Sequence, residues 1–185
     1  MSAFDDHITD ALQRFIGEQR MFFIATAPAE GRINLSPKGM DTFRVLDANR
    51  VAYLDFTGSG NETAAHLHEN GRVTLMFCGF EKKPNIVRLY GSGRVVTPSD
   101  PAWTDLSAHF SILPGARQIM VVAVTSVQSS CGYAVPKFTF EGARETLTKW
   151  AAHKGDEGLE TYRKTRNQTS IDGLAVYPAG GSGEG

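Results

Sequence analysis

The sequence predicts a mostly β protein, an antiparallel barrel with flanking α helices. Several apolar runs that favour strands follow one another at short spacing, and only a few short helical segments interrupt them. A doubly wound dinucleotide-binding fold would alternate strand and helix throughout and place a glycine-rich turn after its first strand. Here that turn comes late, and "GSGNET" lacks the third glycine of the dinucleotide fingerprint. The barrel is therefore the favoured architecture.

The 185 residues are long enough for one domain with a substantial core, which we place at residues 1–178. A helix is expected over 4–19, because the apolar residues between Asp5 and Glu18 recur at helical spacing. The barrel should occupy about 20–136 and C-terminal helices about 140–168. The last residues, 179–185, are expected to form a disordered tail.

Each strand and helix has its own local signal. Clusters of β-branched and aromatic residues indicate strands, with a hairpin in the third of these runs: "MFFIATAP", "INLSPKG", "FRVLDANRVAYLDF", "RVTLMFCGF", "NIVRLYGSGRVV" and "ARQIMVVAVTSVQSSCGYAV". Helical segments are expected in "ETAAHLHEN", "SDPAWTDLSAHF", "EGARETLTKWAAHKG" and "EGLETYRKTRNQ". In the last of these, "TYRKTRNQ" is expected to be a solvated face.

Composition excludes several classes of function. Hydrophobic residues make up 41% and charged residues 21%, and the net charge of −1 lacks the basic excess of a nucleic-acid-binding protein. No signal peptide opens the chain, and no run approaches the roughly 18 apolar residues of a membrane span, so the cytoplasm is the expected location. Cys78 and Cys131 are expected to be buried free thiols. No metal site is expected, because His66 and His68 would face different sides of a helix.

The stretch "TGSGNETAAHLHENGR" joins a predicted strand to a short helix through a glycine-rich turn. A helix N-terminus offers unpaired N–H groups and a partial positive charge, and glycines let a ligand approach the backbone. Ser59, Asn61 and Thr63 add polar side chains there. The alternative is an ordinary capped helix, with Ser59 or Asn61 as the cap. The functional hypothesis is a phosphate-binding turn.

A second stretch, "NLSPKG", strengthens the phosphate hypothesis. It places Ser36 and Lys38 at the end of a short strand, and lysine suits a phosphate as a compact cation. Because an apparent hairpin separates this strand from the glycine-rich turn, the two are expected to meet.

These stretches resemble a known family. "NLSPKG", followed by "VAYLDFTGSGNETAAHLHENGRVTLMFCGFEKKPNIVRLYGSGRVV", is similar to the pyridoxamine 5'-phosphate oxidase-like family of FMN-binding split barrels. "SSCGYAVP" and "RNQTSIDGL" resemble a subgroup with largely unassigned substrates. The resemblance implies a six-stranded antiparallel split β-barrel of the FMN-binding type. It also implies a homodimer with FMN at the subunit interface and an FMN-dependent oxidoreductase acting on a small-molecule substrate.

The resemblance also implies which residues bind the cofactor. Phosphate contacts would come from Ser36, Lys38, Ser59, Gly60, Asn61 and Thr63. The strand carrying Tyr53, Leu54 and Asp55 would run along the flavin ring, Arg88 would contribute from a neighbouring strand, and Tyr133 of the other subunit would cover the ring.

The sequence departs from the vitamin B6 oxidases of that family. "GSGNET" carries no cation, which leaves Lys38 with most of the positive charge at the phosphate. "LAVYPAGGSGEG" lacks the arginine and histidine that grip a substrate phosphate, so the substrate is not expected to be a vitamin B6 phosphate. No catalytic acid or base is identified. Three alternatives remain: a non-catalytic flavin- or haem-binding module, a deazaflavin-dependent reductase of the same fold, and a structural domain with a degenerate cavity.

Overall fold

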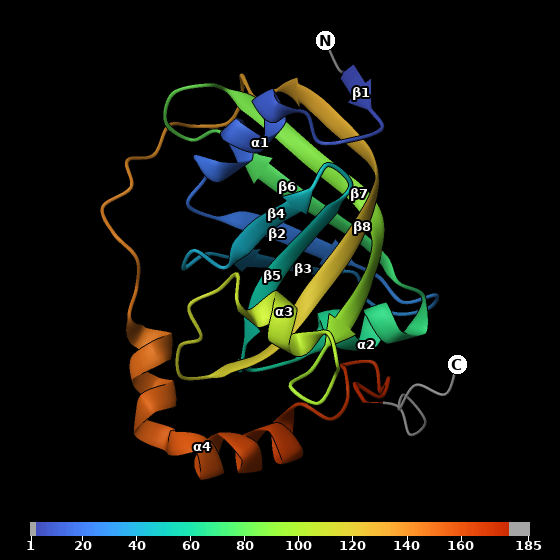
Figure 1. Ribbon diagram of the computed structural model, residues 1–185, viewed down its shortest axis with the longest axis vertical. Helices are drawn as coiled ribbons and strands as arrows, with labels where there is room; N and C mark the ends of the chain where they lie inside the picture. Colours follow the sequence, from blue (N-terminus) through green and yellow to red (C-terminus); the bar gives the residue numbers. More distant parts are fainter. Residues whose placement is uncertain (1–2, 178–185) are drawn as a thin grey trace.

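The computed structural model describes residues 3–177 and has one antiparallel sheet as its centre (Figure 1). The sheet has eight strands. Their bounds are β1 (Ala3–Asp5), β2 (Phe22–Thr26), β3 (Asn34–Lys38), β4 (Phe43–Asp47), β5 (Arg50–Phe56), β6 (Arg72–Cys78), β7 (Asn85–Val96) and β8 (Ala116–Cys131). The tail expected at 179–185 lies outside the described residues.

The strand order leaves the barrel open on one side. Neighbouring strands follow the path β3-β2-β6-β7-β8-β5-β4, and β1 pairs with β8 off this path. Because β3 and β4 end the path without pairing with each other, the sheet curls without closing. The predicted class, a mostly β antiparallel split barrel with flanking helices, is confirmed, with eight strands instead of the six that the resemblance implied.

The N-terminal helix is shorter than the expected 4–19. Helix α1 spans Asp10–Gly17, and Thr9 caps it by accepting a hydrogen bond from the Leu12 amide at 3.3 Å. The residues before it form β1, which pairs with β8. The apolar spacing correctly predicts the buried face of the helix, because Leu12, Phe15 and Ile16 are buried. The predicted range was too long at its start, because the helix begins only after its N-cap, Thr9.

Alternation along the strands divides the core into two layers. The inner layer surrounds an aromatic group of Phe22, Phe43, Tyr53 and Phe77, whose ring centroids lie 4.9 to 5.6 Å apart in contacting pairs. On the opposite face, β5 and β8 pack against α3 (Trp103–Ser107). Successive residues of β5 therefore point into different layers.

Two further helices flank the sheet. Helix α2 (Glu62–Glu69) follows β5, and α4 (Thr146–Arg166) bends at Gly155, where φ is 65° and ψ is 174°. The irregular segment after β8 runs along one side of the barrel to reach α4 (Figure 1). Within residues 3–177, no helix has the length and apolar character needed to cross a membrane.

The two cysteines differ in exposure. Both are free thiols, and Cys78 is buried as expected. Cys131 is exposed, so the prediction of burial was wrong there. Cys131 is exposed because it is the last residue of β8 and pairs with Asn85, the first residue of β7, where the pairing of the two strands ends.

Candidate functional site

Lys38 and Asp55 form an ion pair at the open side of the barrel. Lys38 is the last residue of the edge strand β3, and its Nζ lies 2.8 Å from Oδ1 of Asp55 on β5. The lysine side chain is 25% exposed, whereas the aspartate is 2% exposed. The cation therefore lies at the mouth of the site, and the carboxylate lies at its floor.

Asp55 is shared between Lys38 and two residues of β8. Its second oxygen, Oδ2, accepts hydrogen bonds from Nε of Arg117 at 2.7 Å and from Nε2 of Gln118 at 2.9 Å. Burial alone would raise the pKa of Asp55, but the charges of Lys38 and Arg117 outweigh it and hold this pKa well below its ordinary value. The carboxylate stays ionised, and the two cations leave one positive charge in excess.

The glycine-rich turn is tied to the same residues. Nη2 of Arg117 donates to the Gly60 carbonyl at 3.0 Å, and Nε2 of Gln118 donates to Oδ1 of Asn61 at 2.7 Å. These bonds connect the turn to Asp55 and through it to Lys38. The predicted meeting of the Lys38 strand with the turn is therefore seen in this structure.

The first turn of α2 has no side-chain cap. Asn61 occupies the N-cap position, but its side chain bonds to Gln118 and to Tyr177 instead of to the helix amides. Ser59, the other candidate cap, is exposed in the turn. The capped-helix alternative is thus wrong for this chain. The acidic residue of the first turn, Glu62, accepts a hydrogen bond from the Ile171 amide at 3.1 Å, so the amides at the helix start have no side-chain partner in the described part of the chain.

Ser36 and Thr63 meet through a residue that the sequence analysis missed. Oγ of Ser36 donates to Oδ1 of Asn34 at 3.0 Å, and Nδ2 of Asn34 donates to Oγ1 of Thr63 at 3.1 Å. The polar side chains of β3 therefore reach the first turn of α2. Asn34 was overlooked although it stands two residues before Ser36, on the same face of the strand.

Tyr53 lies beneath Lys38. Its ring centroid is 5.8 Å from Nζ of Lys38, and the side chain is fully buried. Burial, followed by the charge of Asp55, raises the pKa of Tyr53 well above its ordinary value, so the phenol is neutral. Thr63 lies close enough to oppose this shift, but among the described residues no contact of the hydroxyl meets hydrogen-bond geometry. Leu54 points the other way, into the layer under α3, so only its backbone can face the site.

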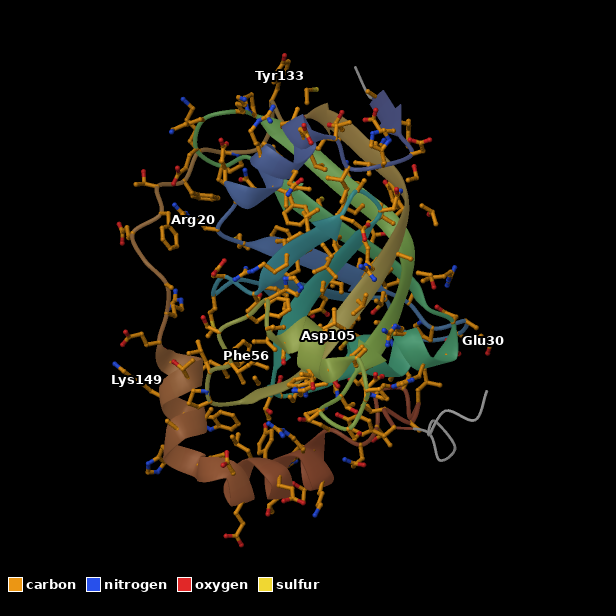
Figure 2. The ribbon with its side chains drawn as sticks, in the orientation of Figure 1. Arg20, Glu30, Phe56, Asp105, Tyr133 and Lys149 are labelled. Atoms are coloured by element: carbon orange, nitrogen blue, oxygen red, sulfur yellow. The ribbon has the colours of Figure 1, made fainter. Side chains whose placement is uncertain are left out.

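Arg88 is not brought to this cluster within one chain. It lies on β7, paired with Met76 and Gln128, and two strands, β2 and β6, separate it from β3. Its neighbour Val87 points into the inner core, so Arg88 points to the opposite face, where Nη1 lies 3.4 Å from Oγ of Ser130. Tyr133 is 83% exposed beyond the end of β8 (Figure 2).

The segment after the bend in α4 adds residues that sequence reasoning missed. We call Arg163, Asn167 and Tyr177 the C-terminal clasp. Nε of Arg163 donates to Oγ1 of Thr57 at 2.8 Å, and Nη1 of Arg117 donates to Oδ1 of Asn167 at 3.0 Å. The Tyr177 hydroxyl lies 3.3 Å from Oε1 of Gln118. The expected solvated face of "TYRKTRNQ" was therefore wrong for Arg163 and Asn167, which turn toward the barrel.

The clasp also corrects the expected charge distribution. Lys38 does not carry most of the positive charge, because Arg117 and Arg163 lie at the same end of the barrel. Burial, and then repulsion from the charge of Arg117, lowers the pKa of Arg163 from its ordinary value. A doubly charged anion would relieve that repulsion.

The glycines of the turn fit a group that lies against them. A Cβ at Gly58 would come no closer than 3.9 Å to another atom of the chain, and one at Gly60 no closer than 3.4 Å. Neither residue has the left-handed φ that favours glycine. The chain's own packing therefore does not require glycine at either position, whereas close approach of a bound group to the backbone would.

A groove of about 970 Å³ begins at the loop that follows Lys38, although Lys38, Asp55 and the glycine-rich turn do not themselves line it. Its lining includes the loop from Gly39 to Arg44, directly after Lys38, and the rings of Phe22, Phe43 and Phe77. Arg20, on the side of the barrel that faces the irregular segment, also lines it (Figure 2). Its volume and its aromatic wall are typical of a site for a flat organic molecule.

The fold and cluster define a split barrel with a cationic site at its open edge, and comparison with known proteins places it. The family model described as pyridoxamine 5'-phosphate oxidase matches residues 8–131. The pyridoxamine 5'-phosphate oxidase family protein ustO of Aspergillus flavus is 38% identical over 192 residues, which cover 94% of this chain and 77% of that protein. The chain belongs to the pyridoxamine 5'-phosphate oxidase family.

Solved structures agree on the fold. A variant of HupZ from Group A Streptococcus matches with a TM-score of 0.54 and 21% identity, covering 66% of this chain and 99% of that one. The FAD-binding protein of Mycobacterium smegmatis matches with a TM-score of 0.50 and 15% identity, covering 67% and 97%. At these identities the likeness concerns the fold alone.

Proposed function

We propose that this chain binds FMN and acts as an FMN-dependent oxidoreductase on a small-molecule substrate. The observation that carries the proposal is the excess positive charge at an uncapped helix start. Lys38 and Arg117 exceed Asp55 by one charge, and the amides of the α2 N-terminus have no side-chain cap. A flavin phosphate is the anion that both the charge and the family membership favour.

Different residues would bind the phosphate and the ring of the cofactor. Lys38 and the turn from Ser59 to Thr63 would bind the phosphate, and Ser36 would add a hydroxyl beside them. Tyr53 lies inward of Lys38, and its buried hydroxyl would hydrogen-bond to a polar edge of the flavin ring. The flavin supplies the electron transfer when bound, so the chain's task is to bind it, orient it and exclude water.

A homodimer with the cofactor at the subunit interface is part of the proposal. Edge strand β3 carries Leu35 at 64% exposure, and Ile33 just before it is 77% exposed. Large apolar side chains on an unpaired edge favour contact with another chain. Arg88 and Tyr133, which one chain keeps away from the cluster, would come from the partner. We place the protein in the cytoplasm.

The proposal is tested by the absorbance spectrum of the protein purified without added cofactor and by titration with FMN, FAD, a deazaflavin and riboflavin. We expect flavin bands, and tighter binding of FMN than of riboflavin, which lacks the phosphate. Equal affinity for FMN and riboflavin would contradict a phosphate site. Uptake of the deazaflavin alone would favour a deazaflavin-dependent reductase.

One observation favours a second candidate, a flavin- or haem-binding module without turnover. The titratable groups at the cluster are poorly suited to proton transfer near neutral pH, because Asp55 is held ionised by two cations and Tyr53 is held neutral by burial. Reduction of the bound flavin by nicotinamide cofactors under anaerobic conditions separates the candidates. Loss of the flavin colour supports the enzyme, and persistent colour with every donor supports the binding module.

A further inference from the structure

The motif "RNQTSIDGL" forms a segment that returns from α4 to the glycine-rich turn. In Figure 1 the chain after α4 lies beside α2. The Ile171 amide lies 3.1 Å from both carboxylate oxygens of Glu62, the first residue of α2. Thr169 and Ala175 pair in an isolated β-bridge, which holds the segment in a compact loop. The motif is thus attached to the start of α2.

Asn167 is the centre of this attachment. It is fully buried, and it uses both ends of its side-chain amide. Its Oδ1 accepts from Nη1 of Arg117 at 3.0 Å, and its Nδ2 donates to the Gly58 carbonyl at 3.2 Å. A guanidinium can only donate and a carbonyl can only accept, so the residue between them needs one acceptor and one donor. Asparagine meets that requirement in a short side chain, whereas aspartate and alanine do not.

Together, Asn167 and Arg117 fix two carbonyls of the turn. Asn167 holds the Gly58 oxygen, and Arg117 holds the Gly60 oxygen at 3.0 Å. Since each peptide unit is planar and trans, a fixed carbonyl also fixes the N–H on the opposite side of the same unit. The amides of Ser59 and Asn61 are therefore directed away from the barrel wall. Within residues 3–177 neither amide donates a hydrogen bond.

We propose that Asn167 is a positioning residue that sets the backbone amides of Ser59 and Asn61 to receive the phosphate of the flavin. This inference rests on the proposed function, because it assigns a role at the same site. Asn167 lies behind the turn, held between Gly58 and Arg117, and it acts through the peptide units that it orients.

The two glycines of the turn explain why a positioning residue is needed. Gly58 and Gly60 allow close approach of a ligand, but glycine has more backbone freedom to lose on ordering than any other residue. A turn without these bonds would lose that conformational entropy when the ligand binds, and the affinity would be lower. Because Asn167 and Arg117 hold the turn in the folded protein, this entropy is already lost during folding, and the phosphate-binding amides are preorganised.

The experiment compares the affinities of the full-length protein for FMN and for riboflavin, together with its thermal unfolding. In Asn167→Ala we expect FMN binding to weaken at least about fivefold while riboflavin binding stays within about twofold, because the lost contacts serve the phosphate alone. Asn167→Asp keeps an acceptor for Arg117 but cannot donate to Gly58, and it should fold. Because its negative charge would itself weaken anion binding, a preference for FMN that persists in this variant counts against the role of Asn167, whereas a loss supports that role only when Asn167→Ala shows it too. Gln168→Ala is the control, since within residues 3–177 that exposed side chain bonds only to the Arg163 carbonyl.

The outcomes separate this inference from the proposed function. Wild-type protein that binds FMN no better than riboflavin would overturn both. Wild-type preference for FMN that persists in the folded variants would overturn the role of Asn167 and leave the proposed function standing. Equal loss of both ligands, or failure of both Asn167 variants to fold, would show a general structural role and would also overturn it.

Discussion

Replacing Lys38 with methionine separates the structural and the binding roles of one ion pair. The lysine is 25% exposed, and its removal leaves Asp55 with Arg117 at 2.7 Å and Gln118 at 2.9 Å. The buried carboxylate therefore keeps a charged partner. We expect the free energy of unfolding to fall by about 1 kcal/mol or less, the usual range for a partly exposed pair.

The effect on FMN should be much larger than the effect on stability. A hydrogen bond to a charged group contributes about 1.5–3 kcal/mol, which corresponds to about 10- to 150-fold weaker FMN binding in Lys38→Met. Riboflavin has no phosphate, so its affinity should change by about twofold or less. The ratio of the two affinities thus isolates the contact with the phosphate.

The assay is a fluorescence titration of each flavin, with urea unfolding of the same preparations. Lys149→Met is the matched control, because Nζ of Lys149 lies 2.7 Å from Oε2 of Glu145 in an exposed pair on α4, away from the cluster (Figure 2). Unchanged FMN affinity in Lys38→Met would refute the phosphate role of Lys38. A parallel loss of FMN and riboflavin would place its contribution at the ring instead.

Three further predictions concern the floor of the site and the turn. Asp55→Asn should lower the free energy of unfolding at pH 7 by about 3–5 kcal/mol, the cost of breaking a buried ion pair. Because the folded pKa of Asp55 is depressed, the wild type should lose this stabilisation as the pH falls below about 4. Urea unfolding from pH 7 to pH 2 should therefore show a larger loss in the wild type than in the variant, which keeps other carboxylates with lowered pKa such as Asp172. Gly58→Ala and Gly60→Ala should fold with stability unchanged or raised by about 0.4–1 kcal/mol, yet bind FMN several-fold less tightly, and undiminished affinity would contradict a ligand against the turn. Tyr53→Phe removes a buried hydroxyl without a partner, so thermal unfolding should show no loss of stability, while a weaker flavin complex would show that the cofactor uses that hydroxyl.

Local sequence patterns were enough to predict the barrel and the meeting of Lys38 with the glycine-rich turn. Strand propensity and turn residues gave the order of β2 to β8, and the glycine-rich turn with Lys38 gave the convergence that the Asp55 network now shows. These features are encoded over a few neighbouring residues. Strand ends and helix ends were less accurate, as β1 and the late start of α1 show, because caps and edge pairing depend on contacts with distant residues.

The residues of the cluster that the sequence did not predict are brought in by strand register and by the C-terminal chain. Gln118 stands opposite Asp55 only because β5 and β8 pair in one particular register. Asn167 reaches Gly58 from 109 residues away, and no local pattern encodes that contact. One signal was present in the sequence: Arg117 and Gln118 are polar residues at the start of the long apolar strand "ARQIMVVAV", where a buried strand would otherwise carry none. Arg88 was grouped with the site by resemblance, although its side-chain face excludes it within one chain.

Asp55 explains how the proposed phosphate site can fold before a ligand binds. Without the carboxylate, Lys38 and Arg117 would face each other at the end of the barrel, and Arg117 is 5% exposed, so its charge would be buried without compensation. A second carboxylate paired with these two cations would remove their excess charge and with it the attraction for an anion; the nearby carboxylate of Glu62 instead accepts a hydrogen bond from the Ile171 amide. One aspartate between Lys38 and Arg117 satisfies both requirements, because it stabilises this cluster and leaves one positive charge in excess at the mouth. The exposed partner, Lys38, is then the cation that can turn toward a phosphate while Arg117 continues to neutralise Asp55.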